Sequence, residues 1–65
     1  MRNRIPDLRR QRGWSQAHLA SQLGVSRQTV NALERGRYDP SLPLAFAIAR
    51  LLGAAIEEVF EPDPE

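Results

Sequence analysis

Residues 14–36 read WSQAHLASQLGVSRQTVNALERG, and this run carries the signals of two short helices with almost no chain between them. Each helix begins after a serine, Ser15 or Ser26, which is a favourable N-cap residue, and each ends before a glycine. The pattern predicts one helix over 16–23 and a second from 27 to about 35. Only a sharp turn fits between them, and two helices joined in this way have the spacing of a helix-turn-helix.

The sequence on either side of this run predicts three more helices. Asn3 is of the right type to cap a first helix that reaches about residue 12, where a glycine follows. Ser41 caps a helix predicted over 42–52, and a short last helix covers 55–59. Apolar residues recur at three-to-four spacing through these segments, so they can close one core. No strand pattern of useful length appears, and we expect an all-α fold.

The composition narrows the class of protein. The 65 residues suffice for one domain over 1–65, and the tail 61–65 holds two prolines and three acidic residues that cannot continue a helix. There is no cysteine, and His18 alone cannot hold a metal ion, so we expect no metal site and no cofactor. No apolar run approaches the roughly 18 residues of a membrane span and no signal peptide is visible, which favours a cytoplasmic protein.

Charge is distributed unevenly along the chain. Residues 1–37 carry eight arginines against two acidic residues, a net charge of +6. Residues 38–65 carry one arginine against six acidic residues, a net charge of −5. This asymmetry indicates that the first half meets a polyanion and the second half does not.

The predicted helix over 27–35 has two different faces. Val30 and Leu33 share the inward face. The opposite face is polar and not acidic, and it consists of Gln28, Asn31, Ala32 and Arg35, while Arg27 stands at the very start and projects past the helix end. Arginine can bind guanine, and glutamine or asparagine can bind adenine, from the major groove of DNA. An ordinary solvated helix has a similar composition, so the tight turn before it and the arginine-rich flank are what favour DNA recognition.

Three segments resemble the signature of the Cro/cI-type (XRE) helix-turn-helix family. They are WSQAHLA at 14–20, LGVSRQTV at 23–30 and LERGRYDPSL at 33–42, and the likeness extends over about residues 4–60. It is nearest to the small one-domain repressors of the cytolysin-operon type. The resemblance implies a five-helix, lambda-repressor-like DNA-binding domain with its helix-turn-helix over 16–35.

The resemblance also implies roles for individual residues. Gln16 and Arg37 would contact phosphates, while Arg27 and Gln28 would read bases. The full set expected at double-stranded DNA is Gln16, Ser26, Arg27, Gln28, Thr29, Asn31, Arg35, Arg37 and Tyr38. Arg9 would form a structural ion pair with Glu34, which removes an unpaired acid from the neighbourhood of phosphate.

A homodimer reading a palindromic operator is expected, because one helix-turn-helix contacts too few base pairs for a unique genomic site. The acidic second half is the natural place for the subunit contact, since it does not compete with phosphate. The interface residues expected are Phe46, Leu51, Ile56, Val59 and Phe60. In similar small repressors the chain ends pair as a β-ribbon, which here would join 2–4 to 60–62.

Two other functions remain open at this stage. The fold also serves antitoxins, which bind a toxin and repress their own operon, and the acidic tail would then hold the toxin. A module that binds another protein or co-regulator instead of DNA is the second alternative. No nucleophile–base pair, metal cluster or phosphate-binding glycine loop is present in the sequence, so we do not expect an enzyme. The sequence does not distinguish repression from activation.

Overall fold

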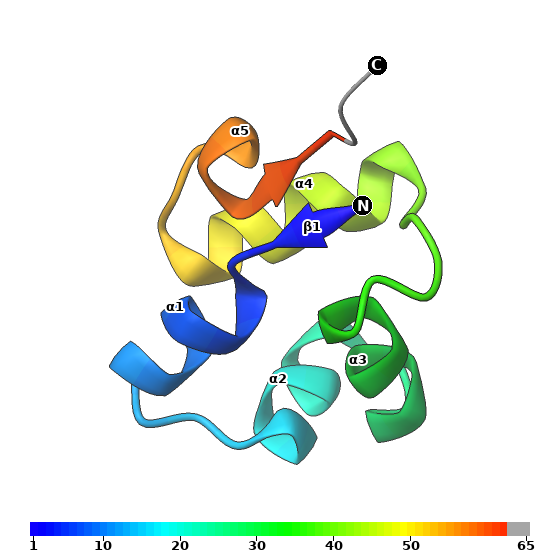
Figure 1. Ribbon diagram of the computed structural model, residues 1–65. Helices are drawn as coiled ribbons and strands as arrows, with labels where there is room; N and C mark the ends of the chain where they lie inside the picture. Colours follow the sequence, from blue (N-terminus) through cyan, green and yellow to red (C-terminus); the bar gives the residue numbers. More distant parts are fainter. Residues whose placement is uncertain (63–65) are drawn as a thin grey trace.

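Five short helices and a two-stranded ribbon make up the fold, seen in a computed structural model that describes residues 1–62 (Figure 1). In chain order the elements are β1 (Arg2–Asn3), α1 (Ile5–Gln11), α2 (Gln16–Leu23), α3 (Arg27–Glu34), α4 (Leu42–Leu52), α5 (Ile56–Val59) and β2 (Phe60–Glu61). The expected five-helix architecture is confirmed. Residues 63–65 of the acidic tail lie outside the described part of the chain.

Three serines begin helices, as their positions in the sequence predict. The hydroxyl oxygen of Ser15 accepts a hydrogen bond from the amide of His18 at 3.0 Å, at the start of α2. Ser26 does the same at α3, at 3.1 Å, and Ser41 at α4, at 3.3 Å. Each hydroxyl satisfies an amide that has no acceptor inside its helix.

The start of α1 differs from the prediction. The helix begins at Ile5, and Arg4 occupies the N-cap position without a side-chain hydrogen bond. Asn3 is not the cap because its backbone is extended and paired in β1. Its side chain still reaches the helix, since Asn3 Oδ1 accepts a hydrogen bond from the Ile5 amide at 3.1 Å.

The two ends of the described chain pair as an antiparallel ribbon. Arg2 lies opposite Glu61 and Asn3 opposite Phe60. The Arg4 amide extends the pairing by donating to the carbonyl of Val59 at 2.8 Å. The ribbon expected from the resemblance is therefore present, one residue shorter on each strand, and Pro62, which has no N–H, follows it.

A single core lies between the helices and beneath the ribbon. Val59 and Phe60, both expected at the subunit contact, belong to it, with 0% and 9% of their surface exposed. The ribbon turns the chain back across the core after α5 and buries both side chains within the monomer. The other buried apolar residues are Ile5, Leu19, Ala20, Val30, Leu33, Ala45, Ile48, Ala49 and Leu52.

No helix within residues 1–62 has both the length and the apolar character needed to cross a bilayer.

Candidate nucleic-acid interface

One face of α3 packs in the core, and the other face is exposed to solvent. Val30 and Leu33 are 1% and 2% exposed and pack in the core. Arg27 and Gln28 are exposed at the first turn of the helix, and Asn31 is half-buried on the same side. The helix therefore offers a guanidinium and two carboxamides at its surface, which are the groups that pair with base edges in a major groove.

The turn between α2 and α3 has one conformation available to it. Gly24 ends α2 in the left-handed region, at φ 73°, where an L side chain is strained. The Val25 amide then bonds to the carbonyl of Ala20 at 3.1 Å, which the Gly24 amide also reaches, so the end of α2 is closed by both. α2 and α3 pack directly against each other. The angle between the two helices is fixed by this turn and by their contact.

The first turn of α3 is ordered by its own cap. Besides accepting from the Thr29 amide, the Ser26 hydroxyl lies 2.9 Å from the Thr29 hydroxyl. Both side chains are thus engaged in forming the helix start. Ser26 and Thr29 thus hold the backbone of the first turn in place. The side chains of Arg27 and Gln28 take no part in these contacts and are exposed.

A buried ion pair joins α1 to the last residue of α3. Arg9 Nε donates to Glu34 Oε2 at 2.7 Å and Nη2 donates to Oε1 at 3.1 Å, with side-chain exposures of 9% and 6%. The remaining Arg9 Nη1 donates to the carbonyl of Trp14 at 2.9 Å. Hydrogen bonding to Glu34 raises the pKa of Arg9 above its ordinary value, against the lowering effect of burial. The structure thus contains the pair that the family resemblance implied.

Gln16 joins the same network, which sequence reasoning missed. Its Nε2 donates to Glu34 Oε1 at 3.0 Å, so Glu34 accepts from two different helices. Gln16 is half-buried and opens α2. The carboxamide expected to meet a phosphate is therefore oriented by a protein contact before any ligand arrives. Three-residue networks of this kind leave no signal in sequence spacing.

The end of α3 and the loop after it carry the remaining residues expected at DNA. These are two arginines and a tyrosine, Arg35, Arg37 and Tyr38, and all three are exposed. The Arg37 amide bonds to the carbonyl of Ala32 and the Gly36 amide to that of Leu33, both at 3.0 Å, which closes the helix end. The base of the Arg37 side chain is thereby fixed relative to α3, while its guanidinium is free to move.

His18 is exposed on α2 but has a partner that the sequence did not predict. Its ring centroid lies 5.0 Å from that of Trp14 at an interplanar angle of 58°. On Trp14 itself, the Arg12 guanidinium lies 5.3 Å from the ring centroid. Trp14 is half-buried against the core, as its place before the Ser15 cap predicts. The cluster joins the end of α1 to the first turn of α2.

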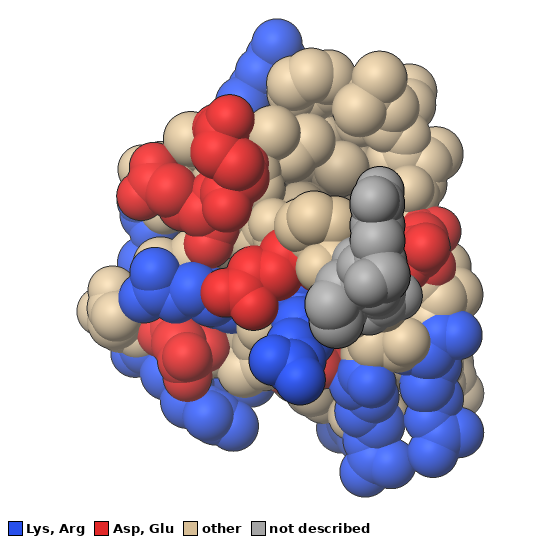
Figure 2. All heavy atoms as spheres, turned by 45° about the horizontal axis from the view of Figure 1, so that its top comes forward, with Lys and Arg blue, Asp and Glu red and all other residues tan. Residues whose placement is uncertain are grey.

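The two charge classes separate on the surface. Figure 2 turns the top of Figure 1 towards the viewer, and carboxylate side chains gather over the middle and upper part of this face. Most of the arginine side chains project along its lower rim, the side on which Figure 1 places α2 and α3. The asymmetry along the sequence is thus also an asymmetry in space, with positive potential towards α3.

Comparison with known families identifies this arrangement. The helix-turn-helix family model HTH_3 matches residues 7–59, which include α2 to α5 in full and all of α1 except its first two residues. The chain belongs to the Cro/cI-type helix-turn-helix family. Similar proteins are described as HTH-type transcriptional regulators, and this chain is a DNA-binding transcriptional regulator and not an enzyme.

Relatives and solved structures agree with this assignment. An uncharacterized HTH-type transcriptional regulator of Methanocaldococcus jannaschii is 50% identical over 60 residues, which cover 92% of this chain and 91% of the relative. The restriction-modification controller protein C.AhdI of Aeromonas hydrophila superimposes with a TM-score of 0.78 at 35% identity, covering 88% of this chain and 86% of that one. The biofilm regulator SinR, solved in complex with DNA, gives 0.75 at 25% identity, with coverages of 83% and 87%.

Proposed function

We propose that this Cro/cI-type regulator is a dimeric repressor that reads a palindromic operator with α3, its recognition helix. The observation that carries the proposal is the division of α3 into a buried face and a free one. Val30 and Leu33 anchor it, while Arg27 and Gln28 extend from its first turn into solvent. Arg27 would bind the O6 and N7 atoms of a guanine and Gln28 the N6 and N7 atoms of an adenine.

The remaining site residues fix the register on the duplex. The Gln16 carboxamide, oriented by Glu34, would donate to a phosphate at one edge of the major groove. Arg37 and Tyr38, in the loop after α3, would hold a phosphate at the other edge, with Arg35 nearby. Asn31, half-buried in the middle of α3, would reach a base or the backbone. Such contacts supply affinity without sequence preference.

The subunit contact is proposed at α4 and α5. Phe46 is 47% exposed, which is unusual for so large an apolar side chain in a small domain. It borders a shallow hollow that Ile56 also lines, and Arg50 and Glu57 stand at its rim. Opposite charges on one patch are self-complementary under two-fold symmetry, because each meets its opposite on the second copy. Leu51 is half-buried nearby on α4, whereas Val59 and Phe60 are no longer candidates.

A dimer formed in this way would act by occlusion. Figure 1 places α4 and α5 at the end of the molecule away from α2 and α3, so pairing there leaves both recognition helices free. Two-fold related helices about 34 Å apart meet two major grooves on one side of the duplex. A dimer seated over a promoter blocks access of the polymerase.

Selection of bound sites from random DNA tests this proposal directly. A dimeric reader returns a palindrome with half-sites about one helical turn apart, whereas sites without symmetry would refute the two-fold arrangement. Sedimentation of the Phe46→Glu variant tests the interface, and it should shift the chain from dimer to monomer. Leu42→Glu is the matched control, because Leu42 is 64% exposed on the same helix but does not border the hollow. Equal effects of the two substitutions would contradict an interface centred on Phe46.

A further inference from the structure

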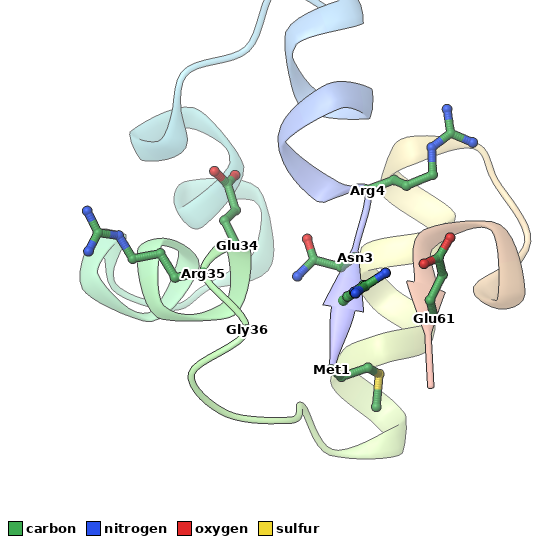
Figure 3. A pocket seen from close by; sticks show the side chains of 8 residues that line it. Met1, Asn3, Arg4, Glu34, Arg35, Gly36 and Glu61 are labelled. Carbon is green, nitrogen blue, oxygen red and sulfur yellow. The ribbon is translucent and has the colours of Figure 1, made fainter. Parts of the chain in front are cut away.

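A polar hollow separates β1 from the end of α3. Met1, Asn3 and Arg4 line one side of it, and Glu34 to Gly36 line the other. Figure 3 shows the Arg4 and Arg35 side chains pointing away from each other and out of the hollow. The guanidinium groups of Arg4 and Arg35 therefore do not converge on a common point. What crosses it instead is the side chain of Asn3, directed from β1 towards α3 in the same view.

Asn3 uses both ends of its carboxamide. Nδ2 donates to the carbonyl of Leu33 at 2.8 Å, across 30 residues of sequence. Oδ1 accepts from the amide of Ile5 at 3.1 Å. One end needs a donor and the other an acceptor, so only one orientation of the carboxamide satisfies both contacts. Asn3 therefore links the last turn of α3 to the first turn of α1.

The hydrogen bond from Asn3 to Leu33 is additional to the backbone hydrogen bonds that end α3. The Leu33 carbonyl already accepts from the Gly36 amide at 3.0 Å, so it is satisfied without Asn3. Gly36 lies against the residue that precedes β1, because a Cβ built on it would lie 2.8 Å from the carbonyl oxygen of Met1. The backbone of Met1 thus rests directly on the turn that precedes Arg37.

α1 and the strand before it therefore hold α3 at two points. Arg9, in α1, binds Glu34. Asn3, in the strand β1 that precedes α1, binds Leu33. The bonds from Arg9 and Gln16 hold Glu34, the last residue of α3, and the bond from Asn3 holds Leu33, the residue before it. Two contacts on successive residues, made from separate positions on one support, restrict the tilt of α3 relative to the body of the protein.

We propose that Asn3 is a positioning residue for DNA reading, which sets the tilt of the recognition helix and the position of the loop that carries Arg37. This inference rests on the proposed function, since it requires that α3 reads bases. Asn3 itself need not touch DNA. Because the Leu33 carbonyl keeps the Gly36 donor, loss of the Asn3 bond costs little folding stability, yet it removes the hydrogen bond that ties β1 to the last turn of α3.

Two variants separate the two halves of the Asn3 side chain. Asn3→Asp keeps an acceptor for the Ile5 amide but loses the donor to Leu33, whereas Asn3→Ala loses both. Glu58→Ala is the matched control, because it removes one hydrogen bond, to the Ala55 amide at 3.0 Å, from the start of α5. The ratio of affinities for operator and random DNA is measured for each at a temperature where all are folded.

Both Asn3 variants should lower that ratio about 3- to 10-fold, as expected for loss of one hydrogen bond, and Glu58→Ala should leave it unchanged. The extra negative charge of Asn3→Asp weakens binding to operator and random DNA alike, so its effect cancels in the ratio of the two affinities. An unchanged ratio for Asn3→Asp, with a wild-type protein that clearly prefers its operator, would overturn the positioning role.

Amide hydrogen exchange in the free protein gives a second measurement that does not depend on DNA. Asn3→Asp should speed exchange of the Gly36 and Arg37 amides about 3- to 10-fold, while amides of α5 keep their wild-type rates. Unchanged exchange at these two amides would also overturn the inference. A wild-type protein without any operator preference, but with the expected exchange pattern, would instead refute the proposed function and leave the restraint on α3 established.

Discussion

Replacing Glu34 by glutamine should be among the most destabilising conservative changes in this protein. Glu34 accepts hydrogen bonds from Arg9 at 2.7 and 3.1 Å and from Gln16 at 3.0 Å, and its side chain is 6% exposed. A glutamine has one oxygen for these three donors and turns an NH₂ group towards another donor. It also leaves the Arg9 guanidinium, which is 9% exposed, without a counter-charge.

The expected cost follows from burial. Removing one partner of a buried ion pair typically costs about 3–5 kcal/mol, because the other charge remains buried and unpaired. The carboxamide oxygen keeps part of the hydrogen bonding, so we expect about 2–4 kcal/mol for Glu34→Gln. A domain of this length has a total stability of about 3–10 kcal/mol. The variant should therefore lose a large part of its free energy of unfolding.

Urea unfolding followed by circular dichroism measures this cost, and a double variant tests its cause. Arg9→Met combined with Glu34→Leu removes both charges and keeps the apolar volume, so it should recover most of the lost stability. Arg9→Met alone should resemble Glu34→Gln. A cost below about 1 kcal/mol for Glu34→Gln would refute the reasoning, since it would mean that solvent reaches the pair. A double variant less stable than either single one would refute it as well.

The stability that Arg9 contributes through its pair with Glu34 should not change with pH near neutrality. Hydrogen bonding to Glu34 raises the pKa of Arg9. A base with a raised pKa in the folded state contributes stability that is fully present below its unfolded pKa and is lost only as the pH rises through the folded value. The Arg9 contribution should thus stay constant up to about pH 9, which the same unfolding experiment measures.

Three further changes probe the DNA-binding side and the helix end. Arg27→Ala should weaken operator binding by about 1–3 kcal/mol and relax the preference at one base position, and equal losses on random DNA would contradict base reading. Arg37→Ala should weaken binding to all sequences and lower the slope of affinity against salt by about one; an unchanged slope would exclude a phosphate contact. Gly36→Ala should destabilise the fold more than Gly24→Ala does, as thermal unfolding can measure, because both glycines have φ near 70° but only Gly36 lies against Met1.

Helix boundaries were the most predictable part of the structure. Caps act locally, so Ser15, Ser26 and Ser41 each determine a helix start from the residue itself and its three successors. Asn3 shows the limit of that reasoning. It has the right side chain for a cap, but pairing with Phe60 decides its backbone conformation, and that partner lies at the other end of the chain.

The burial of apolar side chains late in the chain was predicted less well, for a physical reason. An apolar side chain near the end of a chain is suited equally to a core and to an interface, and sequence periodicity does not separate the two. Val59 is fully buried because the ribbon brings it inward, whereas Phe46 stays 47% exposed on the outer side of α4. The contacts of Gln16 with Glu34 and of Asn3 with Leu33 likewise depend on how helices are placed in space.

The terminal ribbon imposes an order on folding. β1 precedes α1 and β2 follows α5, so the two strands can pair only after every helix between them has been synthesised. The helices, whose contacts are local, can form earlier. A growing chain would thus form α3, with Glu34 bound by Arg9 and Gln16, before pairing with β2 fixes the strand that carries Asn3. The last restraint on the end of α3 would therefore form only once β2 has been made.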